Sequence, residues 1–155
     1  MITSRVDVHL APWLTEHGFS ADAVNANEKH SLTPLMRAAR QGDNDIVTEL
    51  LRCGAQLETR NTDGNNALWF ACVGEHLPTM ELLIQLGIDI NNQNDNGATC
   101  LMYASSTGKF AVLQTLLQAG ADTRCTSLDD FTALDVAATY ECLTVLRRST
   151  ATLGA

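Results

Sequence analysis

The stretch TPLMRAA, residues 33–39, decides the fold, because its pattern returns three times along the chain. NALWFAC (66–72), TCLMYAS (99–105) and TALDVAA (132–138) carry the same leucine and the same alanine in the same places. Each copy follows the one before it by 33 residues, and the interval is kept without a gap. A period of this length is typical of a chain built from stacked structural units.

Each unit predicts a turn followed by two short helices. Asp63-Gly64 and Asn96-Gly97 are tight-turn dipeptides. Two or three residues later, a side chain that can cap a helix N-terminus stands in every unit: Thr33, Asn66, Thr99 and Thr132. The first helix is expected to break at Gly42 and Gly108, with Glu75 and Glu141 at the equivalent places. The second helix then shows apolar residues at i, i+3, i+4 and i+7, as in DIVTELLRCG (45–54), and stops at glycine.

The repeated pattern resembles the ankyrin repeat, whose unit of 33 residues opens its first helix with T-P-L-H-x-A. The phrases GIDIN (87–91) and GADTR (120–124) are also similar to the ending of that repeat. The resemblance implies an all-α repeat solenoid, an ankyrin-like stack of turn-helix-loop-helix units with β-turn fingers. It covers about residues 28–150.

The expected organisation is a single domain over residues 1–155. Residues 1–27, which contain WLTEHGF, would form an N-terminal helical cap. Full repeats would follow at 28–60, 61–93 and 94–126. Residues 127–150 would form a C-terminal capping repeat with a shortened second helix, and 151–155 a tail.

The histidine of the family signature is absent from every unit, where Met36, Trp69, Met102 and Asp135 replace it. In the family this histidine helps to hydrogen-bond neighbouring turns. The two methionines and the tryptophan are expected to fill its space by packing, with Trp69 wedged between units.

Charge and composition narrow the partners. The net charge of −8 disfavours nucleic acid and anionic membrane, so we expect a basic or neutral protein partner. No apolar run has the length of a signal peptide or a transmembrane helix. Five scattered cysteines without a C-x-x-C pair indicate reduced thiols in a cytoplasmic protein. An interaction scaffold of this kind is expected to be a monomer.

No catalytic, cofactor or metal motif occurs in the sequence, so we expect neither an enzyme nor a cofactor or metal site. One alternative is a thiol-based regulator or metal carrier, for which Cys72 and Cys100 on neighbouring first helices are the best pair. A second is an enzyme of unrecognised type. A third is the same scaffold acting as a secreted effector.

The resemblance implies that the first helices and the turn tips line a concave groove for a partner protein. The residue after the signature-histidine position points into that groove, which predicts that Phe70 and Tyr103 face outward from adjacent units. The alternative for Phe70 is packing against Trp69 or a neighbouring finger. The candidate partner-binding residues are Arg37, Arg40, Phe70, Tyr103, Asp63, Asn65, Asp95, Asn96, Thr107, Phe131 and Tyr140.

Overall fold

A computed structural model describes residues 4–20, 24–25 and 32–153, and within them every regular element is an α-helix. The helices are α1 (Ser4–Glu16), α2 (Pro34–Gln41), α3 (Asn44–Arg52), α4 (Ala67–Val73), α5 (Leu77–Gln85), α6 (Cys100–Thr107), α7 (Phe110–Gln118) and α8 (Tyr140–Leu153). The predicted all-α repeat solenoid is therefore confirmed. No helix in the described part of the chain is long and apolar enough to span a membrane.

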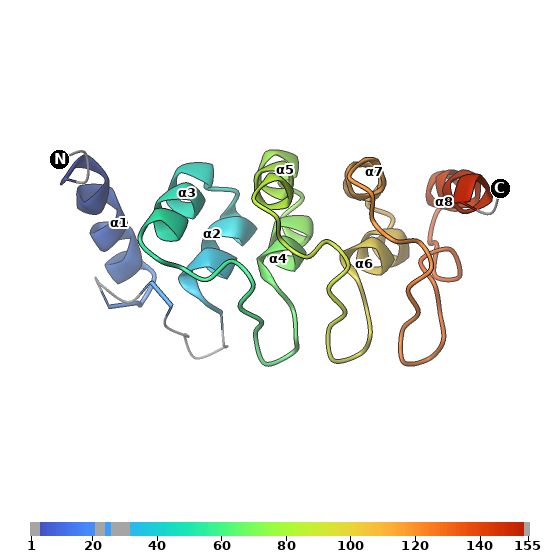
Figure 1. The fold of residues 1–155 in the computed structure, drawn as a ribbon, viewed down its shortest axis with the longest axis horizontal. Helices are drawn as coiled ribbons and strands as arrows, with labels where there is room; N and C mark the ends of the chain where they lie inside the picture. The colour runs from blue at the N-terminus through green and yellow to red at the C-terminus, as the bar shows by residue number, and fades with distance from the viewer. Residues whose placement is uncertain (1–3, 21–23, 26–31, 154–155) are drawn as a thin grey trace.

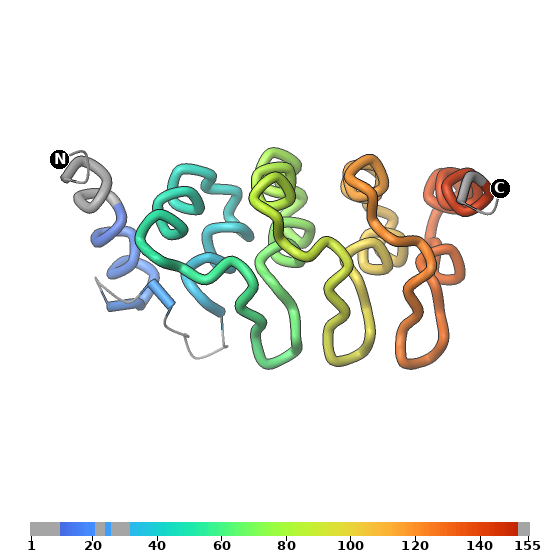
Figure 2. Tube along the Cα trace, viewed as in Figure 1, coloured from blue at the N-terminus to red at the C-terminus, as the bar shows by residue number. Residues whose placement is uncertain are grey.

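The units stand side by side in three rows (Figure 1). The second helices α3, α5, α7 and α8 form one row, and the first helices α2, α4 and α6 lie beneath them. Long turns project below the first helices, and Figure 2 shows that they run parallel to one another. We call these turns finger 2 (61–65), finger 3 (94–98) and finger 4 (127–131).

The first helices begin at the predicted caps. Oxygen atoms of the Thr33, Asn66 and Thr99 side chains accept hydrogen bonds from the backbone N–H three residues on, at 3.2, 3.3 and 3.2 Å. These bonds satisfy donors that a helix start otherwise leaves without partners. The capping function read from the sequence is confirmed at these three residues.

Three of the four predicted breaks also occur, and one of these three lacks glycine. Gly42 and Gly108 take the left-handed conformation at φ 74° and 70°, and Glu75 takes it at φ 58°. Side chains resist this region of backbone space, so Glu75 accepts a strain that glycine avoids. The left-handed turn thus occurs at the same position of the repeat even where the residue is glutamate rather than glycine.

The core runs through the first three repeats along the repeated leucine and alanine positions, and Leu134 and Ala137 of the fourth pack against it half-buried. Leu35, Leu68 and Leu101 are at most 2% exposed. The units approach so closely that a Cβ added to Gly74 would lie 2.4 Å from the carbonyl oxygen of Arg40. Burial of this continuous apolar column is the main stabilising contribution in a repeat stack.

The fourth unit differs from its prediction. No first helix forms at 134–139, the second helix α8 is the longest of the described helices rather than a shortened one, and Glu141 lies inside it. The carboxylate of Asp135 accepts hydrogen bonds from the backbone N–H and the hydroxyl of Thr132, at 2.9 and 3.0 Å, which closes a single turn. The Ala138 N–H then donates to the Ser105 carbonyl in the preceding unit. This hydrogen bond to the end of α6 uses the Ala138 N–H, so the single turn does not continue into a helix.

At the other end, α1 continues the row of second helices and packs against α3. This position is the one that a helical N-terminal cap requires. Part of the predicted cap, residues 1–3, 21–23 and 26–27, lies outside the described residues, and so does the finger of the first repeat. The domain boundaries stay predictions.

Candidate functional site

An aromatic pair joins the second and third units on the first-helix row. The rings of Trp69 on α4 and Tyr103 on α6 have centroids 4.9 Å apart and planes tilted by 43°. Both side chains are half-buried. The prediction that Trp69 lies between units is confirmed, because its ring contacts the next repeat. Because both side chains are half-buried, part of this aromatic pair stays at the surface, and aromatic surface most often carries binding energy in protein interfaces.

A lysine completes this cluster. The Nζ atom of Lys109 lies 5.4 Å from the centroid of the Tyr103 ring and donates a hydrogen bond of 3.0 Å to the carbonyl of Val73. It also lies 3.8 Å from the carboxylate of Glu75. Lys109 therefore bridges the third unit to the second and fixes the position of the Tyr103 ring through a cation–π contact.

Phe70 corrects the sequence interpretation. It is 8% exposed and belongs to the core, so the expectation that it faces outward is wrong. Within α4 only Trp69 and Val73, one helical turn apart, are half-buried, while the remaining side chains are buried. Phenylalanine has no polar atom and is buried at no hydrogen-bonding cost, whereas the indole N–H of tryptophan requires a partner. The larger and more polar ring therefore takes the exposed face of this helix.

The other predicted groove residues of the first helices reach the surface to different degrees. Arg40 is exposed at the end of α2, and Arg37 is half-buried one turn earlier. Thr107 is exposed at the end of α6, with its hydroxyl donating to the Tyr103 carbonyl at 2.7 Å. These residues lie on the row that holds the aromatic pair. Tyr140 does not: it is 80% exposed and lines a cleft with Phe110 between α7 and α8, among the second helices.

The fingers present a mainly acidic edge. Asp63, Asp95 and Asn96 are exposed, and Phe131 is 49% exposed, as their placement at turn tips predicts. Asn65 is the exception, because it is 7% exposed and its Oδ1 atom accepts a 3.0 Å hydrogen bond from Asn94. Asn65 therefore holds two fingers together rather than offering a surface.

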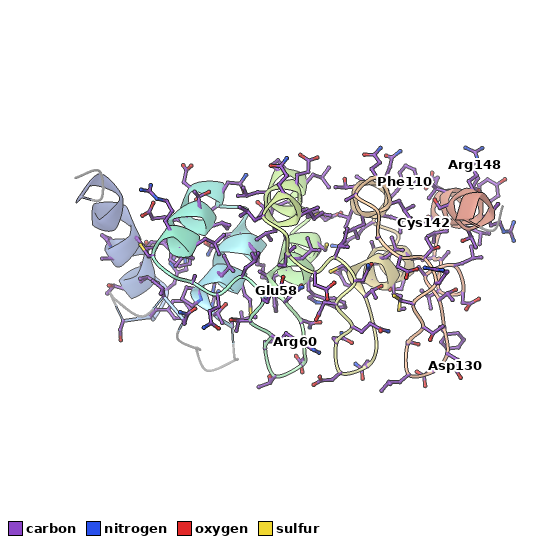
Figure 3. All side chains as sticks on the ribbon, viewed as in Figure 1. Glu58, Arg60, Phe110, Asp130, Cys142 and Arg148 are labelled. Carbon is purple, nitrogen blue, oxygen red and sulfur yellow. The ribbon has the colours of Figure 1, made fainter. Side chains whose placement is uncertain are left out.

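A hydrogen-bonded ladder links the fingers, and the sequence reasoning missed it. Arg60 donates through Nε to the Gly64 carbonyl at 3.0 Å and through Nη2 to the Gln93 carbonyl at 2.9 Å. Gln93, 33 residues later, repeats the arrangement with the carbonyls of Gly97 and Thr126. Figure 3 shows Arg60 in the finger row. Arg60 and Gln93 thus supply a polar linkage between neighbouring fingers. Their 33-residue spacing is the sequence signal that could have revealed it.

The best cysteine pair for a thiol-based function lies inside the core. None of the five cysteines forms a disulfide, and Cys72 and Cys100 lie buried on neighbouring first helices. A hydrogen bond with Cys100, together with burial, raises the pKa of Cys72 well above its usual value. A raised pKa keeps the thiol protonated, and the protonated thiol is a poor nucleophile and metal ligand. Within the described residues, no three histidine, cysteine or acidic side chains gather in a way that could hold a metal ion.

Comparisons with known proteins agree with this architecture. A family model described as "Ankyrin repeats (3 copies)" matches residues 4–94, 35–127 and 89–151. The tyrosine-protein kinase HTK16 of Hydra vulgaris is 38% identical over 61 residues, which are 39% of this chain and 8% of the kinase. The potassium channel AKT2/3 of Arabidopsis thaliana is 39% identical over 51 residues, 33% of this chain and 6% of the channel. The chain spans less than a tenth of either relative, so the likeness concerns the repeats alone. With matches from residue 4 to residue 151, this chain belongs to the ankyrin-repeat family.

Proposed function

We propose that this protein is a non-enzymatic scaffold that binds a partner protein through its first helices and fingers. Ankyrin repeats are generally protein-interaction modules, which supports the class of function. The location of the binding surface is proposed from the half-buried pair of Trp69 and Tyr103. The exposed Arg40 and Thr107 flank this pair along the row of first helices. Aromatic side chains and arginine are the most frequent interface anchors.

Rigid presentation is the mechanism that we propose. The Arg60–Gln93 ladder fixes the fingers, and Lys109 fixes the Tyr103 ring against the unit before it. A surface that is ordered before the partner arrives loses little conformational entropy on binding. More of the contact energy then remains as affinity.

The partner is a basic or neutral protein, and neither nucleic acid nor a membrane. The net charge of −8 and the exposed Asp63 and Asp95 on the fingers support this choice, since like charges repel. We further propose a cytoplasmic location, because five cysteines without a disulfide suit a reducing compartment. We also propose that the scaffold is a monomer. Light scattering on purified protein checks the oligomeric state.

The test is affinity purification from the native source with the full chain as bait. Wild type is compared with the Tyr103→Ala, Arg40→Ala double variant and with the control Gln85→Ala, which lies exposed among the second helices. We expect one protein to co-purify with wild type and with the control. Its recovered amount should fall at least about tenfold with the double variant. Equal recovery by all three baits contradicts the location, and the absence of any specific partner contradicts the function.

A further inference from the structure

Finger 4 differs from the fingers before it in carrying two large apolar side chains at the surface. Leu128 is 75% exposed and Phe131 is 49% exposed. The equivalent positions in the second and third repeats hold small or polar residues: Thr62 and Asp95 for Leu128, and Asn65 and Ala98 for Phe131. In the first repeat Leu32 is the equivalent of Phe131, but it is buried in the core at 7% exposure. The second and third units are therefore built without large apolar side chains at these positions. Packing within the stack does not account for Leu128 and Phe131.

The backbone that holds these side chains is ordered by the neighbouring finger. The Leu128 N–H donates to the carbonyl of Asn96 at 3.0 Å, and the Ser127 N–H donates to the carbonyl of Phe131 at 2.9 Å. Gln93 donates to the Thr126 carbonyl at 2.8 Å just before the turn. Two exposed apolar groups on an ordered turn lose little entropy when a partner covers them.

The charges around this apolar pair are negative. Asp129 and Asp130 stand between Leu128 and Phe131 in the chain and are exposed, and Figure 3 places Asp130 at the finger tip. Exposed Asp95 continues the acidic edge on finger 3, where the only described base within reach is Arg60, 3.9 Å from its carboxylate. An occupant that covers the apolar pair must therefore bring positive charge.

We propose that finger 4 is a docking point for a partner segment with an apolar side chain next to lysine or arginine. Burial of Leu128 and Phe131 provides the attraction, since apolar surface leaves water. Asp129 and Asp130 select for the basic flanks and speed association. This inference rests on the proposed function and adds to it a position and a partner chemistry.

The experiment selects from a phage-displayed library of random 12-residue peptides on the immobilised full chain. Selected peptides are then measured against wild type, the Leu128→Ser, Phe131→Ser double variant and the control Leu86→Ser. Leu86 is 49% exposed at the end of α5, so the control removes similar apolar surface elsewhere. We expect peptides that combine apolar residues with lysine or arginine, and at least about a tenfold loss of affinity with the double variant alone. Unchanged circular dichroism of the variants shows that the stack remains folded.

The charge is tested separately with the Asp129→Asn, Asp130→Asn double variant. We expect about a threefold or greater loss of peptide affinity at low salt, and a smaller loss in 0.5 M NaCl, where exposed charges are screened. An equal affinity of wild type and this variant at low salt overturns the basic character of the partner.

The remaining outcomes separate this inference from the function on which it rests. Peptides that lose binding with Tyr103→Ala but keep it with the finger 4 variants support the proposed function and overturn this docking point. A selection without any binder overturns both. The wild-type chain could also self-associate, and the Leu128→Ser, Phe131→Ser double variant could abolish that association. This result would identify a second copy of the chain as the occupant and would overturn the proposal of a basic partner.

Discussion

The rings of Trp69 and Tyr103 lie 4.9 Å apart, although 34 residues separate them, and this contact joins two units of the stack. Trp69 stands where the neighbouring units bury Met36 and Met102, at 1% and 5% exposure. The indole therefore extends toward the surface and meets the ring of the next first helix. One residue of the second unit thus serves both the stacking of repeats and the candidate binding face.

This contact predicts energetic coupling between the two rings. We expect Trp69→Ala to lower the free energy of unfolding by about 2 kcal/mol, below the cost for a fully buried tryptophan. A double-mutant cycle with Tyr103→Ala should give a coupling energy of about 1 kcal/mol. Urea denaturation measures all four proteins. Strictly additive losses would show that the two rings do not interact in solution.

Glu75 predicts a stabilising substitution. Its φ of 58° lies where Gly42 and Gly108 stand in the neighbouring units. We expect Glu75→Gly to raise the free energy of unfolding by about 1 kcal/mol, because glycine adopts this conformation without strain. Thermal unfolding checks the result. The matched control is Glu75→Ala, which also removes the exposed contact to Lys109 but keeps a Cβ, so a gain of equal size there would contradict the argument.

A substitution at Gln93 measures how much the hydrogen-bonded ladder between the fingers contributes to the free energy of unfolding. Gln93→Met keeps the length of the side chain and removes both hydrogen bonds, to Gly97 at 3.0 Å and to Thr126 at 2.8 Å. We expect a loss of about 1 kcal/mol in urea denaturation. Backbone amide exchange should also become faster in finger 4. The free energy of unfolding of the control Gln85→Met on α5 should stay within about 0.5 kcal/mol of the wild-type value. A similar loss of stability in both variants would show that the ladder does not stabilise the protein.

Thr123 predicts a second stabilising substitution. It is 6% exposed, and its hydroxyl oxygen is buried with no hydrogen-bond partner in the described part of the chain. The preceding repeats carry Leu57 and Ile90 at this position. We expect Thr123→Val to stabilise the protein by about 1 kcal/mol, because a methyl group replaces an unsatisfied hydroxyl. Calorimetry measures the change. Thr115→Val, whose hydroxyl donates to the Ala111 carbonyl, should show no such gain.

Asp135 predicts a dependence of stability on pH. Hydrogen bonds from the backbone N–H and the hydroxyl of Thr132 lower the pKa of this carboxyl. The charged form is favoured in the folded state, so its stabilisation is complete above the ordinary aspartate pKa of about 3.9. It is lost as the pH falls through the lowered value. The difference in urea midpoint between wild type and Asp135→Asn should therefore shrink from pH 6 to pH 3. A difference that stays constant over this range would exclude the linkage.

The sequence alone determined the repeat, and it determined the caps and breaks of the first three units. These features depend on residues a few positions apart, such as Thr33 with the Met36 N–H, or on a backbone conformation that the register repeats. Such local interactions can be predicted from the sequence. The 33-residue interval strengthens the prediction, because the same pattern occurs in several units. The same interval placed the exposed tips of the fingers correctly at Asp63, Asp95 and Asn96.

Away from the finger tips, only the tertiary structure decided which candidate side chains face outward. The exposure of Trp69 and the burial of Phe70 depend on the rotation of α4 against both neighbouring units. Asn65 is buried because Asn94 reaches it from the next finger. The fourth first helix is missing because Ala138 bonds to the preceding unit, which also carries Tyr140 into the row of second helices. Each outcome is set by contacts between residues about 30 positions apart, and no local propensity encodes the balance among such contacts.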